Sequence, residues 1–185
     1  MKKILIALGL ALLALVIYLG YSGLFISANI VEKDLGPYHL VYLKHKGDYK
    51  GIRKVQMDVY QAIVKSSKAK PTIGFGIYYD NPAKVAKEKL RSEGGCIVSK
   101  EEFNKIKKAK PKIKLLFKKL ESSKYAVSEF PYKNNFSVLF GILKSYPKLN
   151  EYQKNKGYKQ TYSIEMYDVP NKKLIFAFPI VIKKK

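Results

Sequence analysis

The sequence contains no tryptophan, one cysteine and two histidines among its 185 residues. The single cysteine, Cys96, excludes an internal disulfide framework and a cysteine-based metal cluster. Two histidines, His39 and His45, are too few to complete a closed zinc site. The chain also lacks a Gly-x-x-x-x-Gly-Lys-Ser/Thr run and a Gly-x-Gly-x-x-Gly run, which argues against a nucleotide-phosphate cradle. We therefore expect neither a metal nor a cofactor.

Acidic residues are scarce: 14 Asp and Glu stand against 36 Lys and Arg, which gives a formal net charge of +22. Only Arg53 and Arg91 are arginines, and lysine does not supply the bidentate fork that reads guanine and phosphate. Specific nucleic-acid recognition is therefore not expected. Attraction to an anionic membrane surface explains the excess of lysine at least as well as nucleic-acid binding does. An AT-rich coding sequence, which favours lysine codons, is a further explanation. The 47% of hydrophobic residues is enough for a folded core.

A long uncharged run, residues 4–26, follows two lysines at the N-terminus. At 1.5 Å per residue it spans about 34 Å, enough to cross a bilayer core of about 30 Å. Tyr18 and Tyr21 lie near its far end, where amphipathic rings favour the membrane interface. The run is longer than the apolar region of a signal peptide, so we favour an uncleaved transmembrane anchor over residues 1–26. A cleaved signal peptide remains the alternative.

The flanking charges suggest how the anchor is oriented. The N-terminal lysines favour a cytoplasmic N-terminus, and the flank Glu32-Lys33-Asp34 is net acidic and easy to translocate. We therefore expect a single-pass protein of the cell membrane with its domain outside. Residues 27–36 are predicted to be a linker, and residues 183–185 a basic tail.

Residues 37–182 are predicted to form one α+β domain. Apolar spacing predicts helices over 49–65 and 136–154, the second interrupted by Pro147. Predicted strands cover 37–46, 72–79, 96–99, 125–132, 158–168 and 174–182, and a helix over 101–108 follows Ser99 as N-cap. Tyr79-Asp80-Asn81-Pro82 recurs 88 residues later as Tyr167-Asp168-Val169-Pro170. This recurrence indicates a duplicated strand-helix-strand-strand unit packed about a pseudo-two-fold axis.

Four segments carry a family resemblance: Gly47-Asp48-Tyr49, Gly76-Ile77-Tyr78-Tyr79-Asp80-Asn81-Pro82, Ile164-Glu165-Met166-Tyr167 and Phe178-Pro179-Ile180. Together they resemble the gyrase-inhibitory-protein-like (GyrI-like, SHS2-type) ligand-binding domain, which also forms the effector-binding part of multidrug-sensing regulators. The resemblance covers about residues 37–182 and implies a duplicated fold in which helices cover one face of the sheet and the other face lines a groove.

A second resemblance includes the anchor. Gly20-Tyr21-Ser22-Gly23-Leu24, Tyr78 to Pro82, Phe130-Pro131-Tyr132 and Glu165-Met166-Tyr167 together are similar to the membrane-anchored testis-expressed reticulophagy receptor family. In that family a long disordered tail carries the autophagy-binding motif. This sequence ends at Lys185, so receptor function cannot be carried over.

Strand alternation sorts the residues of the expected groove. Glu165 and Tyr167 share one face of their strand, and the 88-residue offset maps this face onto Ile77 and Tyr79. Gly74 and Gly76 then face the helices. The predicted ligand-binding residues are Glu165, Tyr167, Phe75, Ile77 and Tyr79, with Tyr42 and Phe130 as further candidates from the first strands.

Aromatic rings and one carboxylate suit a lipophilic cation, because the rings offer cation–π faces and the buried charge needs a partner. The resemblance to multidrug sensors assigns this role to Glu165. A structural role, with Glu165 bonded to a neighbouring tyrosine hydroxyl, stays open.

We favour a membrane-tethered module that binds amphipathic or cationic small molecules. One alternative is a hydrolase of strained electrophiles, in which Glu165 activates water and Tyr167 donates a proton. The other is a membrane-surface scaffold that binds no ligand.

Overall fold

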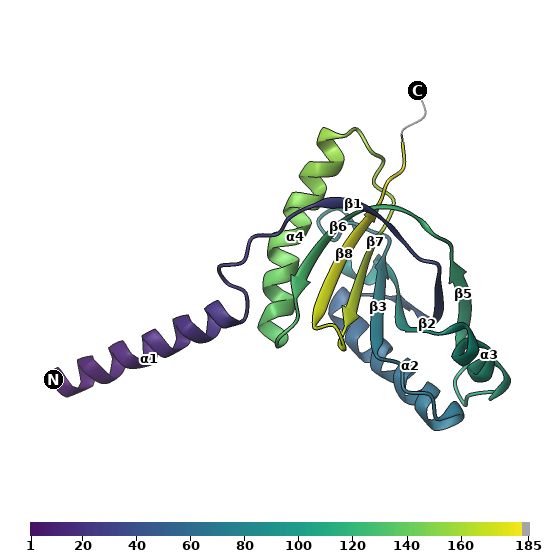
Figure 1. Cartoon of the computed structure of the whole chain (residues 1–185), viewed down its shortest axis with the longest axis horizontal. Coiled ribbons are helices and arrows are strands. Elements are labelled where there is room, and N and C mark those ends of the chain that lie inside the picture. Colours follow the sequence, from purple (N-terminus) through teal and green to yellow (C-terminus); the bar gives the residue numbers. More distant parts are fainter. Residues whose placement is uncertain (183–185) are drawn as a thin grey trace.

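The computed structural model describes residues 1–182, so the predicted basic tail 183–185 lies outside the described residues. A long N-terminal helix projects away from an α+β domain (Figure 1). The helices are α1 (Lys2–Tyr21), α2 (Ile52–Ser67), α3 (Lys100–Lys108) and α4 (Asn135–Asn155). The strands are β1 (Val31–Leu35), β2 (Tyr38–Lys46), β3 (Ile73–Tyr78), β4 (Arg91–Val98), β5 (Leu116–Leu120), β6 (Ser123–Pro131), β7 (Ser163–Asp168) and β8 (Lys173–Pro179). Short 3-10 turns cover Tyr49–Gly51 and Lys87–Lys89.

The eight strands form one antiparallel sheet in the order β1-β6-β8-β7-β3-β4-β2-β5. Its two halves meet where β3 pairs with β7, and each half has the strand-helix-strand-strand order predicted from the sequence. The single 88-residue offset is not kept, however. The helices α2 and α4 begin at residues 52 and 135, whereas β3 and β7 begin at 73 and 163. Unequal connections between the elements shift the spacing from one element to the next.

The segment 27–36, predicted to be a linker, contains the edge strand β1. Val31 to Leu35 pair with β6, and Leu35 is buried in the core. The alternating residues of β1 carry both charges and apolar side chains, and no apolar periodicity marks this short strand in the sequence. The folded domain therefore begins closer to the N-terminal helix than the sequence suggests.

The helices form where the apolar spacing predicts them. On α2, Ile52, Val59 and Ile63 are buried against the sheet. Ser99 caps α3 as predicted, because its side chain accepts a hydrogen bond from the Glu102 backbone in a reciprocal capping box. The predicted interruption at Pro147 is wrong, since α4 runs through it. Buried positions on both sides of the proline pack against the sheet and hold the helix together, although proline disfavours a helix interior.

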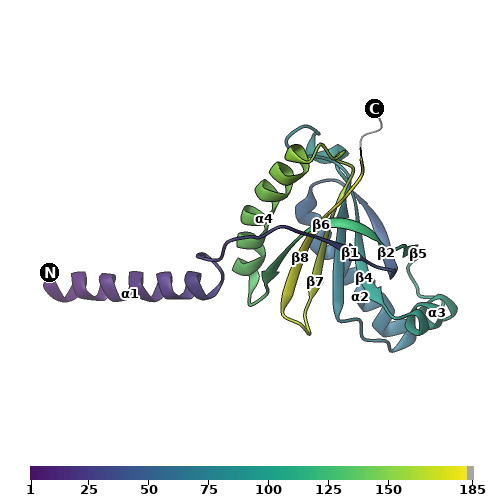
Figure 2. The same ribbon diagram turned by 45° about the horizontal axis from the view of Figure 1, so that its top comes forward.

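The sheet has two distinct faces. It curls around a core that includes Phe75, Ile77, Ile164 and Met166. The helices α2 and α4 cover the other face, α2 over β4 and β2, and α4 over β6 and β8 (Figures 1 and 2). The central strands β3 and β7 lie between the two helices, and on this face they leave a cavity.

Candidate functional site

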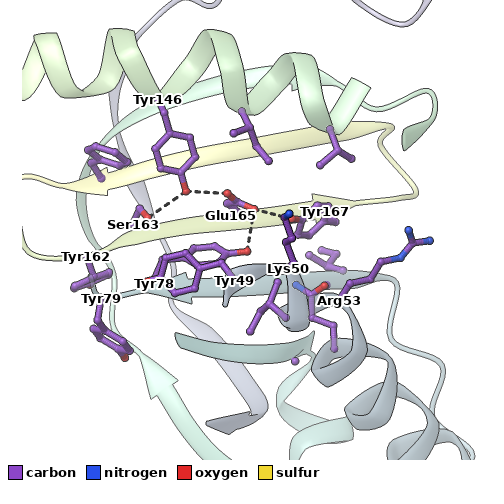
Figure 3. A pocket seen from close by; sticks show the side chains of 18 of the residues that line it. Tyr49, Lys50, Arg53, Tyr78, Tyr79, Tyr146, Tyr162, Ser163, Glu165 and Tyr167 are labelled. Atoms are coloured by element: carbon purple, nitrogen blue, oxygen red, sulfur yellow. Dashed lines mark hydrogen bonds between the residues drawn. The ribbon is translucent and has the colours of Figure 1, made fainter. Parts of the chain in front are cut away.

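The cavity lies between α2 and α4 and has a volume of about 1420 Å³. Its floor is the β3–β7 pair at the centre of the sheet, and its walls come from the two helices (Figure 3). Because one wall and one central strand come from each half of the fold, the cavity lies between the two halves.

A row of residues across the sheet explains why there is space here. Gly94, Gly76, Glu165 and Phe176 lie side by side on β4, β3, β7 and β8 and point to the helix-covered face. The two glycines bring no side chain next to Glu165. A Cβ atom on Gly76 would come within 2.7 Å of the Tyr78 hydroxyl oxygen, so glycine also makes room for that tyrosine.

Glu165 is the chemical centre of the cavity and is only 5% exposed. Three tyrosine hydroxyls donate hydrogen bonds to its carboxylate (Figure 3). Tyr167 and Tyr78 donate to Oε2 over 2.6 and 3.1 Å, and Tyr146 donates to Oε1 over 2.8 Å. The Tyr146 hydroxyl also lies 3.2 Å from Oγ of Ser163. The donors come from β7, β3 and α4, so both halves of the fold hold the carboxylate in place.

The hydrogen-bond partners of Glu165 in this cluster are neutral hydroxyl groups. Burial raises the pKa of Glu165 above its ordinary value of 4.5, and the hydrogen bonds from Tyr167, Tyr146 and Tyr78 oppose that rise. Burial, and then the charge of Glu165, raise the pKa values of the three tyrosines, which therefore remain hydroxyl donors. Within residues 1–182 no lysine or arginine forms an ion pair with Glu165. A buried carboxylate with neutral donors alone is costly, and a positive partner would relieve that cost.

Three of the predicted site residues line the cavity: Glu165, Tyr167 and Tyr79. Glu165 accepts hydrogen bonds from tyrosine hydroxyls, as the structural alternative expects, and it also lines the cavity. A structural role and a ligand-binding role for Glu165 are therefore compatible with each other. Tyr79 lies at the margin, and Figure 3 shows its side chain pointing away from Glu165.

Phe75 and Ile77 are placed on the opposite face of the sheet. Gly76 pairs with Glu165, and the neighbours of Gly76 therefore point into the curled core, where Phe75 and Ile77 pack. The glycines of β3 do face the helices, as predicted. The sequence analysis placed Phe75 and Ile77 on the face of Glu165, whereas in the sheet Glu165 lies beside Gly76. The 88-residue offset therefore relates the faces of the two strands with an error of one residue.

Tyr42 and Phe130 are also outside the cavity. Tyr42 belongs to the core within the curled sheet, with Nζ of Lys118 4.9 Å from its ring centroid. Phe130 packs beneath α4 in a separate core cluster and lies close to Gly23. Both are buried packing residues of the first strand of each half.

Sequence reasoning missed several residues of the cavity. Tyr78 shares a face with Gly74 and Gly76, so correct alternation would have found it. Its ring packs edge-on against Tyr49, with centroids 4.8 Å apart. Tyr146 comes from a helix distant in sequence, and no local pattern distinguishes it from other helical aromatics. At the α2 side, the exposed cations Lys50 and Arg53 line the mouth (Figure 3).

The fold and the site together define a small-molecule-binding domain in which helices from two similar halves enclose an acidic, aromatic cavity. The sequence of residues 28–174 matches the GyrI-like small molecule binding domain. The chain therefore belongs to the family of GyrI-like small molecule binding domains. The comparisons identify no more specific family, so the resemblance to membrane-anchored reticulophagy receptors stays a prediction.

Solved structures share this fold at low sequence identity. The C-terminal domain of EcmrR is 9% identical, with a TM-score of 0.56 over 84% of this chain and 99% of that domain. EcmrR in a complex with DNA is 13% identical, with a TM-score of 0.61 over 98% of this chain and 69% of that chain. SAV2435 bound to tetraphenylphosphonium is 13% identical, with a TM-score of 0.51 over 82% of this chain and 93% of that chain. Among curated proteins no sequence match is found.

Proposed function

We propose that this protein is a membrane-tethered receptor for lipophilic cations and related amphipathic small molecules. The observation that carries the proposal is Glu165, a buried carboxylate with three tyrosine donors and no basic partner within residues 1–182, facing a large cavity. A cation supplies the missing positive charge, and the surrounding rings present faces that attract it. The cavity exceeds the roughly 300–1,000 Å³ of an ordinary small-molecule site, which favours a bulky ligand.

A protein of the same fold supports this ligand class. SAV2435 has been solved with tetraphenylphosphonium, a bulky cation whose charge is shielded by aromatic rings. Such a cation cannot donate a hydrogen bond, so a carboxylate already bonded by tyrosines attracts it through charge alone. Tyr167, Tyr78 and Tyr146 would hold Glu165 in place while the ligand contacts the aromatic walls.

The tether is the N-terminal helix. The helix α1 is long and apolar enough to cross a bilayer, and no residue of it is buried against the domain. We infer a single-pass anchor in the cell membrane, with the N-terminus in the cytoplasm and the domain outside. Tethering places the cavity where lipophilic cations accumulate. A cleaved signal sequence has the same composition, and the mass of the protein purified from membranes would distinguish the two.

The direct test is calorimetric titration of the full chain in nanodiscs of uncharged lipid with tetraphenylphosphonium. We expect saturable binding at one site per chain with weak dependence on salt, because the charge contact is buried. Uptake that does not exceed that of empty nanodiscs would refute the proposal. Binding that disappears at high salt would instead indicate adsorption to the protein surface.

Binding is expected to weaken as the pH falls. The cation binds the ionised form of Glu165, whose pKa in the empty cavity lies above 4.5. Below that pKa the affinity should drop by up to about tenfold per pH unit, and binding should release a proton, since the ligand favours the ionised carboxylate. Titrations between about pH 8 and about pH 4 in buffers of different ionisation enthalpy measure both effects. A dissociation constant that is independent of pH would show that Glu165 does not carry the charge contact.

The cations at the mouth should oppose the ligand. Replacing Lys50 or Arg53 by glutamine removes a positive charge from the cavity entrance. Because both side chains are exposed, we expect only about a two- to fivefold gain in affinity for tetraphenylphosphonium from each substitution. The matched control is Lys105→Gln on the exposed face of α3, outside the cavity lining, which should leave the affinity unchanged. Equal effects at all three positions would mean that net charge, and not the mouth, sets the affinity.

A further inference from the structure

The outer surface of α4 is apolar. Phe136, Leu139 and Leu143 are 43, 47 and 59% exposed and lie on one side of the helix. The opposite side of α4 is buried against the sheet through Gly141 and Leu149, among others. A surface helix normally directs a polar face to water. The exposed apolar residues of α4 therefore suggest a non-aqueous environment on this side of the domain.

This apolar stripe lies where α1 ends. The ring of Tyr18 packs edge-on against Phe136, with centroids 5.9 Å apart. Asn134, the N-cap of α4, donates a hydrogen bond from Nδ2 to Ser22 Oγ over 2.8 Å. Figures 1 and 2 both show α4 running across the end of α1 and not continuing its direction. A bilayer crossed by α1 would thus meet the side of α4 that faces α1.

Lysine contacts fix this arrangement. The ammonium of Lys144 donates to the carbonyls of Leu24 and Ile26, the second over 2.7 Å, and Lys148 donates to the carbonyl of Ala28 over 2.7 Å. These bonds satisfy backbone groups in the segment that leaves α1. They also hold that segment along α4, so the anchor and the helix keep one relative position.

The residues around the stripe have the composition of a membrane interface. Nζ of Lys133 lies 4.3 Å from the ring centroid of Tyr21, and Phe25, whose ring lies near Gly20 of α1, is 73% exposed. Aromatic rings and lysines favour the level of the lipid headgroups, with the rings directed to the acyl chains and the ammonium groups to phosphates. The same set of residues is unusual for a surface that contacts only water.

We propose that the outer face of α4 lies in the interface of the bilayer crossed by α1, with Phe136, Leu139 and Leu143 inserted among the lipids. The occupant of this surface is lipid, because the stripe continues from the end of a predicted span and is flanked by lysines. The inference rests on the proposed tether. Since Val138 and Ile142 of the same helix line the cavity, the α4 wall separates the binding site from the membrane by one helix only.

The absence of tryptophan gives a direct test. The full chain would be prepared with one tryptophan, as Leu139→Trp or Leu143→Trp, and placed in vesicles of uncharged brominated lipid. Ile113→Trp is the matched control, because Ile113 is an exposed apolar residue in the segment between α3 and β5. Figure 1 shows α3 and β5 at the end of the domain away from α1. Leu12→Trp reports whether α1 is inserted. We expect strong loss of tryptophan emission for Leu139→Trp, Leu143→Trp and Leu12→Trp, and none for Ile113→Trp.

Each other outcome overturns the inference in a recognisable way. Quenching of Leu12→Trp alone would leave the tether intact and place α4 away from the lipid. A blue-shifted but unquenched emission from Leu139→Trp would show that a second copy of the chain covers the stripe. No quenching at Leu12 would refute the tether together with the inference. Calorimetric binding of tetraphenylphosphonium is measured separately, so failure of the cavity proposal is distinguishable from all three.

Discussion

Glu165→Gln is expected to weaken the binding of tetraphenylphosphonium strongly and, above the pKa of Glu165, to stabilise the folded domain. Removing one partner of a buried charge pair costs about 2–5 kcal/mol, so the dissociation constant should rise about 30-fold or more. Glutamine has nearly the same shape and keeps an acceptor for the tyrosine hydroxyls. The loss would therefore report the missing charge and not a collapsed cavity.

The gain in stability follows from the direction of the Glu165 pKa. Burial raises this pKa in the folded state above 4.5, so folding favours the protonated carboxyl. The stabilising contribution is fully present below the unfolded pKa and is lost as the pH rises through the folded pKa. Above that folded-state pKa the wild-type protein thus contains an ionised buried group that glutamine does not have. The advantage of Glu165→Gln should shrink as the solution is acidified.

Thermal unfolding and calorimetry on the same samples check both effects. Glu151→Gln, at an exposed position of α4, is the matched control and should change neither quantity. Retained affinity in Glu165→Gln would refute the charge contact. Lost affinity accompanied by a lower melting temperature would show that the three tyrosines need the carboxylate for folding, and Glu165 would then be a structural residue.

Gly95→Ala is expected to lower the stability of the folded domain strongly, because the added methyl group collides with backbone atoms. A Cβ atom at this position would lie 2.0 Å from the carbonyl oxygen of Val41 and 2.7 Å from Cα of Tyr42. Both are backbone atoms of the neighbouring strand β2, which cannot move aside as a side chain can. We expect a loss of about 3 kcal/mol or more, or about 10 °C in melting temperature.

The matched control lies on the adjacent strand. Alanine at Gly74 would have its nearest neighbours at 3.9 Å, which is ordinary van der Waals contact. Gly74→Ala should therefore fold with nearly wild-type stability. Denaturant unfolding of the two variants compares them directly, and equal stability would mean that β2 and β4 do not approach as closely as described. A Gly95→Ala chain that fails to fold beside a folded Gly74→Ala agrees with the prediction.

Local patterns in the sequence were sufficient for most of the fold. The apolar spacing of α2 and the N-cap at Ser99 depend on neighbouring residues, and the structure confirms them. The strand-helix-strand-strand order of each half is also confirmed, although the 88-residue offset that indicated it is not kept. Pro147 shows the limit of such patterns, because packing on both sides of the proline outweighs its local preference. The edge strand β1 is defined by its pairing with β6, which no local signal reveals.

The site was predicted only in part for a similar reason. Glu165 and Tyr167 were found from alternation within one strand and from the family resemblance. Transfer to β3 relied on the 88-residue offset between the repeats, and an error of one residue exchanges the two faces of a strand. Phe75 and Ile77 were consequently selected in place of Tyr78. Tyr146 reaches Glu165 only because α4 packs beside β7, which is a property of the tertiary structure.

The lysine contacts of α4 make the two halves of the fold mechanically unequal. Lys144 and Lys148 bind the segment that leaves α1, so the half built from β6, α4, β7 and β8 is the half that contacts the N-terminal segment. The half that contains α2 is joined to it by the β3–β7 pair and by the core inside the curled sheet. A ligand that widened the cavity would therefore be accommodated by a shift on the α2 side, because α4 is held both by the sheet and by the segment that leaves α1.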